Sequence, residues 1–153
     1  MWSILRAIAP YRLLATALVA VALFQSPYAR AEIPEGIWII PGKVAIRVFD
    51  CSGLLCGQVV WLRDPTLRTP TMCKRTIIWG LQPDGVNRWS NGWFFDPENG
   101  RTFNLSAQLV AADTIEAQIY LGVSLFGRTE ILHRASLEDL AGPCRAGVIS
   151  SAD

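Results

Sequence analysis

The stretch CSGLLCGQVVWL, which runs from Cys51 to Leu62, decides the fold of this chain. Two cysteines, Cys51 and Cys56, enclose a short segment with a glycine, and the β-branched and aromatic residues that follow from Gln58 onward are typical of a strand. Three apolar residues that recur at every second position before this stretch mark one face of another strand: Val44, Ile46 and Val48. The pattern predicts a hairpin with Cys51 opposite Cys56 and with residues 52–55 as its loop.

The second strand of this hairpin is apolar on both faces. Strict alternation places Trp61 on the same face as Val59, and Val60 on the same face as Leu62. A strand that is apolar on both faces is buried on both. We therefore expect its outer face to be covered or to form an interface.

The rest of the chain also reads as strands. Alternation is clearest where Phe103, Leu105, Ala107 and Leu109 are separated by polar residues, and turn signals such as Pro83-Asp84-Gly85 separate the segments. Further strands are predicted at 37–40, 75–81, 93–95, 101–110, 114–121 and 128–134. About eight short strands joined in sequence order predict an all-β fold, a single antiparallel up-and-down β-barrel, which leaves no open edge.

Helix is expected only near the end of the chain. Ser136-Leu137-Glu138-Asp139 is able to cap one short helix, which Gly142-Pro143 would end. The barrel is therefore predicted to finish in a short C-terminal helix or tail.

Residues 1–31 have the features of a secretory signal peptide. Arg6 and Arg12 precede an uninterrupted apolar run from Leu13 to Phe24, and Ala29-Arg30-Ala31 supplies a small-x-small cleavage motif. The alternative is a membrane anchor, but this run is shorter than the roughly 20 residues that span a bilayer as a helix. We predict cleavage after Ala31, a periplasmic or secreted protein without a stable membrane anchor, and one domain over residues 32–153 with its core at 36–134.

Composition argues against two classes of partner. The formal net charge of the whole chain is +1, and loss of Arg6, Arg12 and Arg30 leaves the remainder slightly acidic. The remainder has no long run of lysine or arginine, which argues against nucleic-acid binding and against electrostatic binding to membranes.

All four cysteines lie beyond the signal segment, and an oxidising compartment favours their pairing as disulfides. Four cysteines allow three pairings; we favour Cys51 with Cys56 and Cys73 with Cys144. In the loop-entropy model the short link is worth about 2 kcal/mol and the long one about 4 kcal/mol. A zinc site is the alternative, but the C-x4-C spacing suits it poorly and only His133 adds an imidazole. We expect no metal and no cofactor.

An ordered set of short motifs carries a resemblance to a known family. The set is Cys51-x4-Cys56-Gly57-x-Val59-Val60-Trp61-Leu62, Gly80-Leu81, Gly92-Trp93-x-x-Asp96-Pro97-Glu98-x-Gly100-Arg101-Thr102-Phe103 and Leu121-Gly122-x-Ser124-Leu125-x-Gly127-Arg128-Thr129. It resembles the exported bacterial family DUF2147 over roughly residues 36–134. The resemblance implies a lipocalin-like barrel and no activity. Two features depart from the family: Leu132-His133 replaces an expected tryptophan, and Cys144 lies beyond the matched region.

A second likeness is to the lipocalins proper. Gly36-x-Trp38 resembles their G-x-W signature, in which the indole closes one end of the barrel beneath an arginine of the last strand. The likeness implies a structural role for Gly36, Trp38 and Arg134, through a cation–π contact, with Arg128 as the alternative arginine.

Few residues are candidates for catalysis. His133 is the only histidine, so a nucleophile–histidine pair must use it, and its place in the last strand favours an exposed or packed side chain instead. Asp96 and Glu98 are able to act as paired carboxylates or as calcium ligands, yet turn chemistry explains Asp-Pro-Glu-Asn-Gly without either role. We predict no catalytic residue, and enzymatic activity is the minority hypothesis.

Large aromatic residues are numerous for a small barrel. They either fill the core or line a cavity or an exposed patch, because ligand pockets are mostly apolar with a few polar groups. The candidate ligand contacts are Trp61, Trp79, Trp93, Phe95, Phe103 and Arg128. The sequence thus favours a non-enzymatic binder of a small apolar or amphipathic ligand. The alternative is a filled barrel that docks a protein of the cell envelope.

Overall fold

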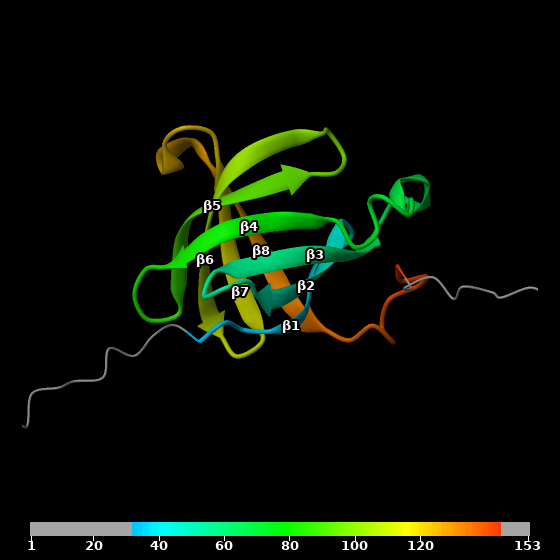
Figure 1. Ribbon diagram of the computed structural model, residues 1–153, viewed down its shortest axis with the longest axis horizontal. Coiled ribbons are helices and arrows are strands. Elements are labelled where there is room, and N and C mark those ends of the chain that lie inside the picture. Colours follow the sequence, from blue (N-terminus) through cyan, green and yellow to red (C-terminus); the bar gives the residue numbers. More distant parts are fainter. Residues whose placement is uncertain (1–31, 145–153) are drawn as a thin grey trace, which may run out of the picture.

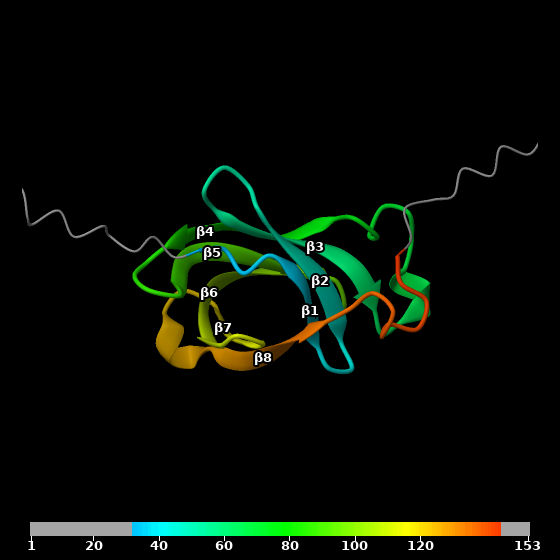
Figure 2. The same ribbon diagram turned by 90° about the horizontal axis from the view of Figure 1, so that it is seen from below.

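The computed structural model describes residues 32–144, which form eight antiparallel strands closed into one barrel (Figure 1). Neighbouring strands follow one another in sequence, and the first strand pairs with the last, so that the view in Figure 2 shows a closed ring. The predicted up-and-down barrel is confirmed. Its strands are β1 (Gly36–Ile40), β2 (Val44–Asp50), β3 (Leu55–Leu62), β4 (Thr76–Pro83), β5 (Arg88–Asp96), β6 (Arg101–Ala111), β7 (Thr114–Tyr120) and β8 (Arg128–Ala135), with short 3-10 turns at η1 (Pro65–Leu67) and η2 (Ser124–Phe126).

The core lies inside the barrel because apolar and polar residues alternate along the strands. In β6 and β7 the partners Leu105 and Ile119 are both buried, as are Ala107 and Ala117. Polar partners such as Ser106 and Gln118 occupy the positions between them and face outward. In β5, Trp89 and Phe94 are buried in the same core.

Both disulfides pair as the sequence favours, Cys51 with Cys56 and Cys73 with Cys144. The predicted pairing of Cys51 opposite Cys56 is not observed. Cys56 faces Phe49 instead, and the last pair before the loop is Asp50 with Leu55. The Asp50 carboxylate accepts a hydrogen bond from the N–H of Gly53 (2.6 Å) and so starts the turn early. The loop is therefore 51–54.

The strict alternation predicted for β3 is wrong because this strand contains a β-bulge. Ala45 of β2 faces Trp61 while Ile46 faces Val59, so Val60 is an extra residue. A bulge reverses the faces of the residues beyond it. Val60 and Trp61 consequently lie together on the outer face, and Val59 and Leu62 both point into the core.

The outer face of β3 is covered, as expected for a strand with two apolar faces. Residues 136–144, here called the C-terminal strap, lie across it. Leu140 of the strap is buried against Ala45 and Val60. The N–H of Cys144 donates a hydrogen bond to the carbonyl of Val60 (2.7 Å).

A turn, and no helix, begins the strap, so of the two expected endings the tail is the one observed. The Asp139 carboxylate accepts hydrogen bonds from the N–H (3.0 Å) and hydroxyl (2.8 Å) of Ser136. Gly142 then takes a left-handed φ of 67° immediately before Pro143, which leaves no room for a second helical turn.

Hydrogen bonds lower the pKa values of two exposed carboxyl groups in these turns. The Ser136 hydroxyl and N–H lower the pKa of Asp139, and the Thr66 hydroxyl and N–H lower that of Asp64 at the start of η1. Ionised carboxylates therefore stabilise both turns at neutral pH.

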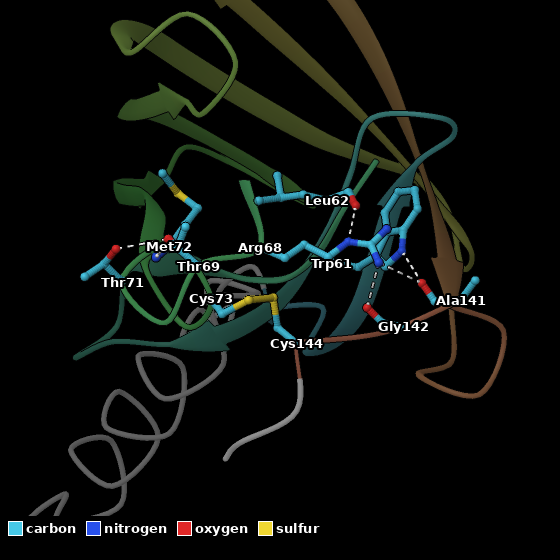
Figure 3. The surroundings of a disulfide bond; sticks show 10 residues. All are labelled: Trp61, Leu62, Arg68, Thr69, Thr71, Met72, Cys73, Ala141, Gly142 and Cys144. Carbon is cyan, nitrogen blue, oxygen red and sulfur yellow. Dashed lines mark hydrogen bonds between the residues drawn. A yellow bond between two sulfur atoms is a disulfide. The ribbon is translucent and has the colours of Figure 1, made fainter. Parts of the chain in front are cut away.

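The strap is held by the disulfide and by Arg68 and Trp61 (Figure 3). The Arg68 guanidinium donates Nε–H to the carbonyl of Leu62 (2.7 Å) and Nη1–H to the carbonyls of Ala141 (3.3 Å) and Gly142 (3.2 Å). The Trp61 indole N–H donates to Ala141 as well (2.9 Å), with Arg68 5.3 Å above its ring. Trp61 thus has a structural role outside the barrel.

The predicted signal peptide and its cleavage site lie outside the described residues. Two disulfides in so small a domain are typical of an exported, non-cytoplasmic protein. Among residues 32–144, no helix has the length and apolar character needed to cross a membrane.

Candidate functional site

One end of the barrel contains Trp38. Its side chain is fully buried, and its indole N–H donates a hydrogen bond to the carbonyl of Pro34 (2.8 Å). The Arg134 guanidinium lies 4.4 Å from the centre of the indole and donates to the carbonyl of Glu35 (2.9 Å). A Cβ on Gly36 would stand 2.8 Å from Arg134 Nη1, so only glycine leaves the guanidinium its place. Arg134 thus packs against both the Trp38 indole and the Gly36 backbone, and the barrel-closing role that the lipocalin likeness implies stays a prediction.

The other end opens into a cavity of about 230 Å³, here called the mouth cavity. Its walls come from the ends of strands that are far apart in the sequence. The apolar part of the lining consists of Ile40, Val44, Leu62, Phe94 and Ile119. The polar part lies at the rim and includes Lys43, Asp96, Arg128 and Glu130.

The charged residues of the rim form a chain of ion pairs. Lys43 pairs with Glu130, and Arg128 pairs with both Glu130 (3.3 Å) and Asp96 (3.4 Å). The side chains of the two cations are 49% and 51% exposed, whereas those of Glu130 and Asp96 are 13% and 10% exposed. The rim therefore exposes both signs of charge: Lys43 and Arg128 are half-exposed and Glu98 of the β5–β6 turn is exposed, whereas Glu130 and Asp96 are largely buried.

Asp96 belongs to the turn between β5 and β6 as well as to the rim. Its carboxylate accepts hydrogen bonds from the N–H of Glu98 (2.9 Å) and from the amide of Asn99 (2.9 Å). This is the turn chemistry expected from the sequence. Because these donors hold the carboxylate, it is placed to orient Arg128.

Below the mouth the barrel is filled by side chains. The interior void amounts to about 20 Å³, which is room for roughly one water molecule. Phe94 and Ile119 line both this void and the mouth cavity. This void is therefore too small for a molecule larger than water.

A second concavity, of about 520 Å³, lies on the outer face of β5 to β8. Its lining is mainly polar and includes Arg88, Gln108, Glu116, Gln118 and Tyr120. It is wide and has no apolar floor. The mouth cavity combines apolar walls with oriented charges, and we treat it as the candidate site.

The predicted ligand contacts do not gather in one place. Arg128 lines the mouth cavity, and Phe103 lies beside it with the guanidinium 5.7 Å from the ring centre. Trp79 and Trp93 are cross-strand partners on the outer face, 37% and 44% exposed, because Ile78 and Phe94 occupy the inward positions next to them.

The other aromatic candidates also lie on the outer surface. Phe95 is half-buried there, with the Arg75 guanidinium 3.9 Å from its ring centre. Trp61 binds the strap, as described above. Of the arrangements that the sequence leaves open, Trp79 and Trp93 take the exposed patch, whereas Trp61 packs against the strap.

Sequence reasoning missed several mouth residues, among them Lys43, Phe94 and Glu130. The signal that would have found Glu130 is alternation: in β8, Arg128, Glu130 and the buried Leu132 share one face. Glu130 is thereby placed on the inner face beside Arg128, at the start of its strand. Lys43, in a turn, gives no such signal.

The candidate histidine lies on the surface. His133 is exposed next to the buried Leu132, so its side chain belongs to the outer face of β8. Asp96 and Glu98, the other candidates for catalysis, both line the mouth cavity. Within residues 32–144, no group of three or more His, Cys, Asp or Glu side chains is arranged to hold a metal ion.

Comparisons with known proteins agree with this fold. A family model described as "Uncharacterized protein conserved in bacteria (DUF2147)" matches residues 36–134. No curated protein matches the chain. Among solved structures, the chain is similar to protein HP1028 from the human pathogen Helicobacter pylori, which is described as belonging to the lipocalin family. That likeness has 17% sequence identity and a TM-score of 0.55, and covers 71% of this chain and 86% of the other, so it shows the fold alone.

Proposed function

This chain belongs to the DUF2147 family, and on that premise we propose that it is an exported, periplasmic binder of a small amphipathic molecule. The observation that carries the proposal is the mouth cavity, where apolar walls lie below two half-exposed cations. The proposed route to the periplasm is the signal peptide, cleaved after Ala31. No cofactor and no enzymatic step is part of the proposal.

The chemistry of the mouth points to an anionic head group on a short apolar body. Arg128 has five N–H donors and Lys43 has three, and the ion pairs described above occupy only part of them. The remaining donors are able to reach a carboxylate or a sulfonate at the rim, because both side chains are half-exposed. The cavity is smaller than the roughly 300–1,000 Å³ of pockets for drug-sized ligands. It therefore suits a short chain or a single ring.

Native mass spectrometry of the protein purified from the periplasm is the first test. We expect a small molecule bound at defined stoichiometry, which denaturing extraction releases for identification. Octanoate serves as a probe if the natural ligand is lost in purification, and it should raise the melting temperature of the protein more than octan-1-ol does, because only octanoate engages the cations. No bound molecule together with no octanoate effect would contradict the proposal.

Variants at the rim separate the head group from the apolar body. Arg128→Gln should weaken octanoate binding about tenfold, the effect of losing one charge-assisted contact, and should leave octan-1-ol binding nearly unchanged. Ile40→Phe narrows the apolar wall and should weaken both. Arg47→Gln, at an exposed position on the outer face of β2, is the control and should change neither. Calorimetry measures the three variants, and equal losses in Arg47→Gln and Arg128→Gln would refute this site.

A second candidate function is docking of an envelope protein, and one observation favours it. Trp79 and Trp93 form an exposed pair beside Phe95, and aromatic residues are enriched at protein interfaces. If this patch is the interface, the amount of partner that co-purifies with the double variant Trp79→Ser/Trp93→Ser should fall at least tenfold. The variant should still bind octanoate. Co-purification that the variant leaves unchanged would exclude the patch.

A further inference from the structure

The connection between β7 and β8 presents apolar side chains to solvent. Residues 121–127, LGVSLFG, contain no charged residue and are here called the apolar loop. Leu125 is 87% exposed and Phe126 is 85% exposed, while Leu121 and Val123 are each 57% exposed. Exposed apolar residues scattered singly are ordinary, but a contiguous group marks an interaction site.

Hydrogen bonds within and around the loop hold it in this conformation. The carbonyl of Ser124 accepts from the amide of Gln118 (3.0 Å) and from the N–H of Gly127 (3.2 Å). The Asn104 side chain accepts from the N–H of Gly122 (3.2 Å). The loop is thus tied once to β6 and once to β7, and it is closed by one hydrogen bond of its own. These hydrogen bonds hold the loop in the conformation in which its apolar side chains are exposed to solvent.

The apolar loop lies beside the mouth cavity. A groove of about 240 Å³ between Phe103 and Phe126 is also lined by Ile119 and Arg128, which line the mouth cavity as well. Arg128 is the charged residue in the lining of this groove. Around it Arg128 and Lys43 are half-exposed and Asp96 and Glu130 are largely buried, while Glu98, which lines the mouth cavity but not this groove, is an exposed carboxylate. Arg101, at the start of β6, adds an exposed arginine two residues from Phe103.

We infer that the apolar loop docks on a lipid surface and holds the mouth cavity at the level of the head groups. Protruding, uncharged side chains insert readily into the soft boundary between head groups and acyl chains, and the neighbouring Arg128 and Arg101 then meet anionic head groups. A protein partner would need a recess that matches four projecting side chains. Docking through so few residues is reversible, which is compatible with the absence of a stable anchor expected from the sequence.

The test uses protein purified after expression of the full chain, mixed with vesicles of phosphatidylethanolamine and phosphatidylglycerol or of phosphatidylcholine alone. The unchanged protein should sediment with the anionic vesicles, and more weakly with the neutral ones. Leu125→Asp and Phe126→Asp should each weaken binding about tenfold, and the double variant about a hundredfold. Val86→Asp is the matched control, because Val86 is 72% exposed in the β4–β5 turn, and it should bind as the unchanged protein does.

Two further measurements make the outcome decisive. Amide hydrogen exchange of residues 121–127 should slow when vesicles are added, and octanoate binding by the double variant should stay unchanged, which separates this inference from the proposed function. Failure of the unchanged protein to bind either vesicle would overturn the inference. Vesicle binding by the double variant that equals that of the unchanged protein would also overturn the inference. If the unchanged protein is a dimer in solution and the double variant is a monomer, the apolar loop binds a second copy of the chain. That result would also overturn docking on lipid.

Discussion

Replacing Trp38 by alanine is expected to lower the free energy of unfolding by about 3–5 kcal/mol, as removal of a large aromatic side chain from a core does. Trp38 is fully buried, its N–H has the Pro34 carbonyl as partner, and Arg134 lies against its ring. The substitution leaves a cavity, an unpaired carbonyl and a guanidinium without its aromatic contact, all at the point where β1 meets β8. Urea denaturation followed by far-ultraviolet circular dichroism measures the loss.

The matched control for this experiment is Trp93→Ala, which removes a side chain of the same type from the outer surface. Trp93 is 44% exposed, so its loss creates no internal cavity, and we expect it to cost less than half as much. Trp38→Phe keeps an aromatic ring for Arg134 and should cost an intermediate amount. Equal destabilisation by Trp38→Ala and Trp93→Ala would show that the closed end does not depend on Trp38.

Removing the Cys73–Cys144 disulfide, by changing both cysteines to serine, is expected to cost about 4 kcal/mol. Its sequence separation is 71 residues, so the link removes much more freedom from the unfolded chain than the Cys51–Cys56 link, whose separation is 5. The matched pair Cys51→Ser/Cys56→Ser should cost about 2 kcal/mol. Chemical denaturation of the two double variants under oxidising conditions tests the order, and the reverse order would contradict the loop-entropy account.

Loss of the long disulfide should also loosen the C-terminal strap. Trp61 and Arg68 alone would then hold Ala141 and Gly142 against β3. We expect residues 136–144 to exchange amide hydrogens at least tenfold faster, and a dye that binds apolar surface to detect the uncovered Val60. Unchanged exchange would mean that Arg68 and Trp61 suffice. In the Cys51→Ser/Cys56→Ser control the strap should stay protected.

Most of the fold was predictable because its determinants are local. Alternation in β6 and β7 fixes which residues point inward, and turn residues such as those at 96–100 fix where strands end. The prediction was wrong where a local rule was broken without a signal of its own. Nothing in the amino-acid sequence of β3 shows that Val60 is the extra residue of a β-bulge, yet the bulge decides on which face Trp61 lies. Nor does Ser136 to Asp139 reveal that its capping pattern ends in a single turn.

The candidate site was less predictable because closure of the barrel assembles it. Lys43 follows β1, Phe94 lies near the end of β5 and Glu130 is in β8, so sequence proximity gives no hint that they meet. Tryptophan content pointed instead to Trp79 and Trp93, whose outward direction depends on the neighbours that fill the inside. Residue type suggested an apolar or amphipathic ligand with Arg128 among its contacts, whereas the ion pairs that join Arg128, Glu130 and Lys43 at the rim appear only in three dimensions.

The seam between β1 and β8 sets an order for folding. Seven of the strand pairs join neighbours in sequence and are able to form as hairpins while the chain is synthesised, but Ile37 meets Ala135 only at the end. Until β8 arrives, β1 is an open edge with unpaired N–H and C=O groups, which another chain is able to pair with. The partly made barrel is therefore the species most prone to aggregate. A factor that shields β1 during synthesis would raise the yield of folded protein without changing its final stability.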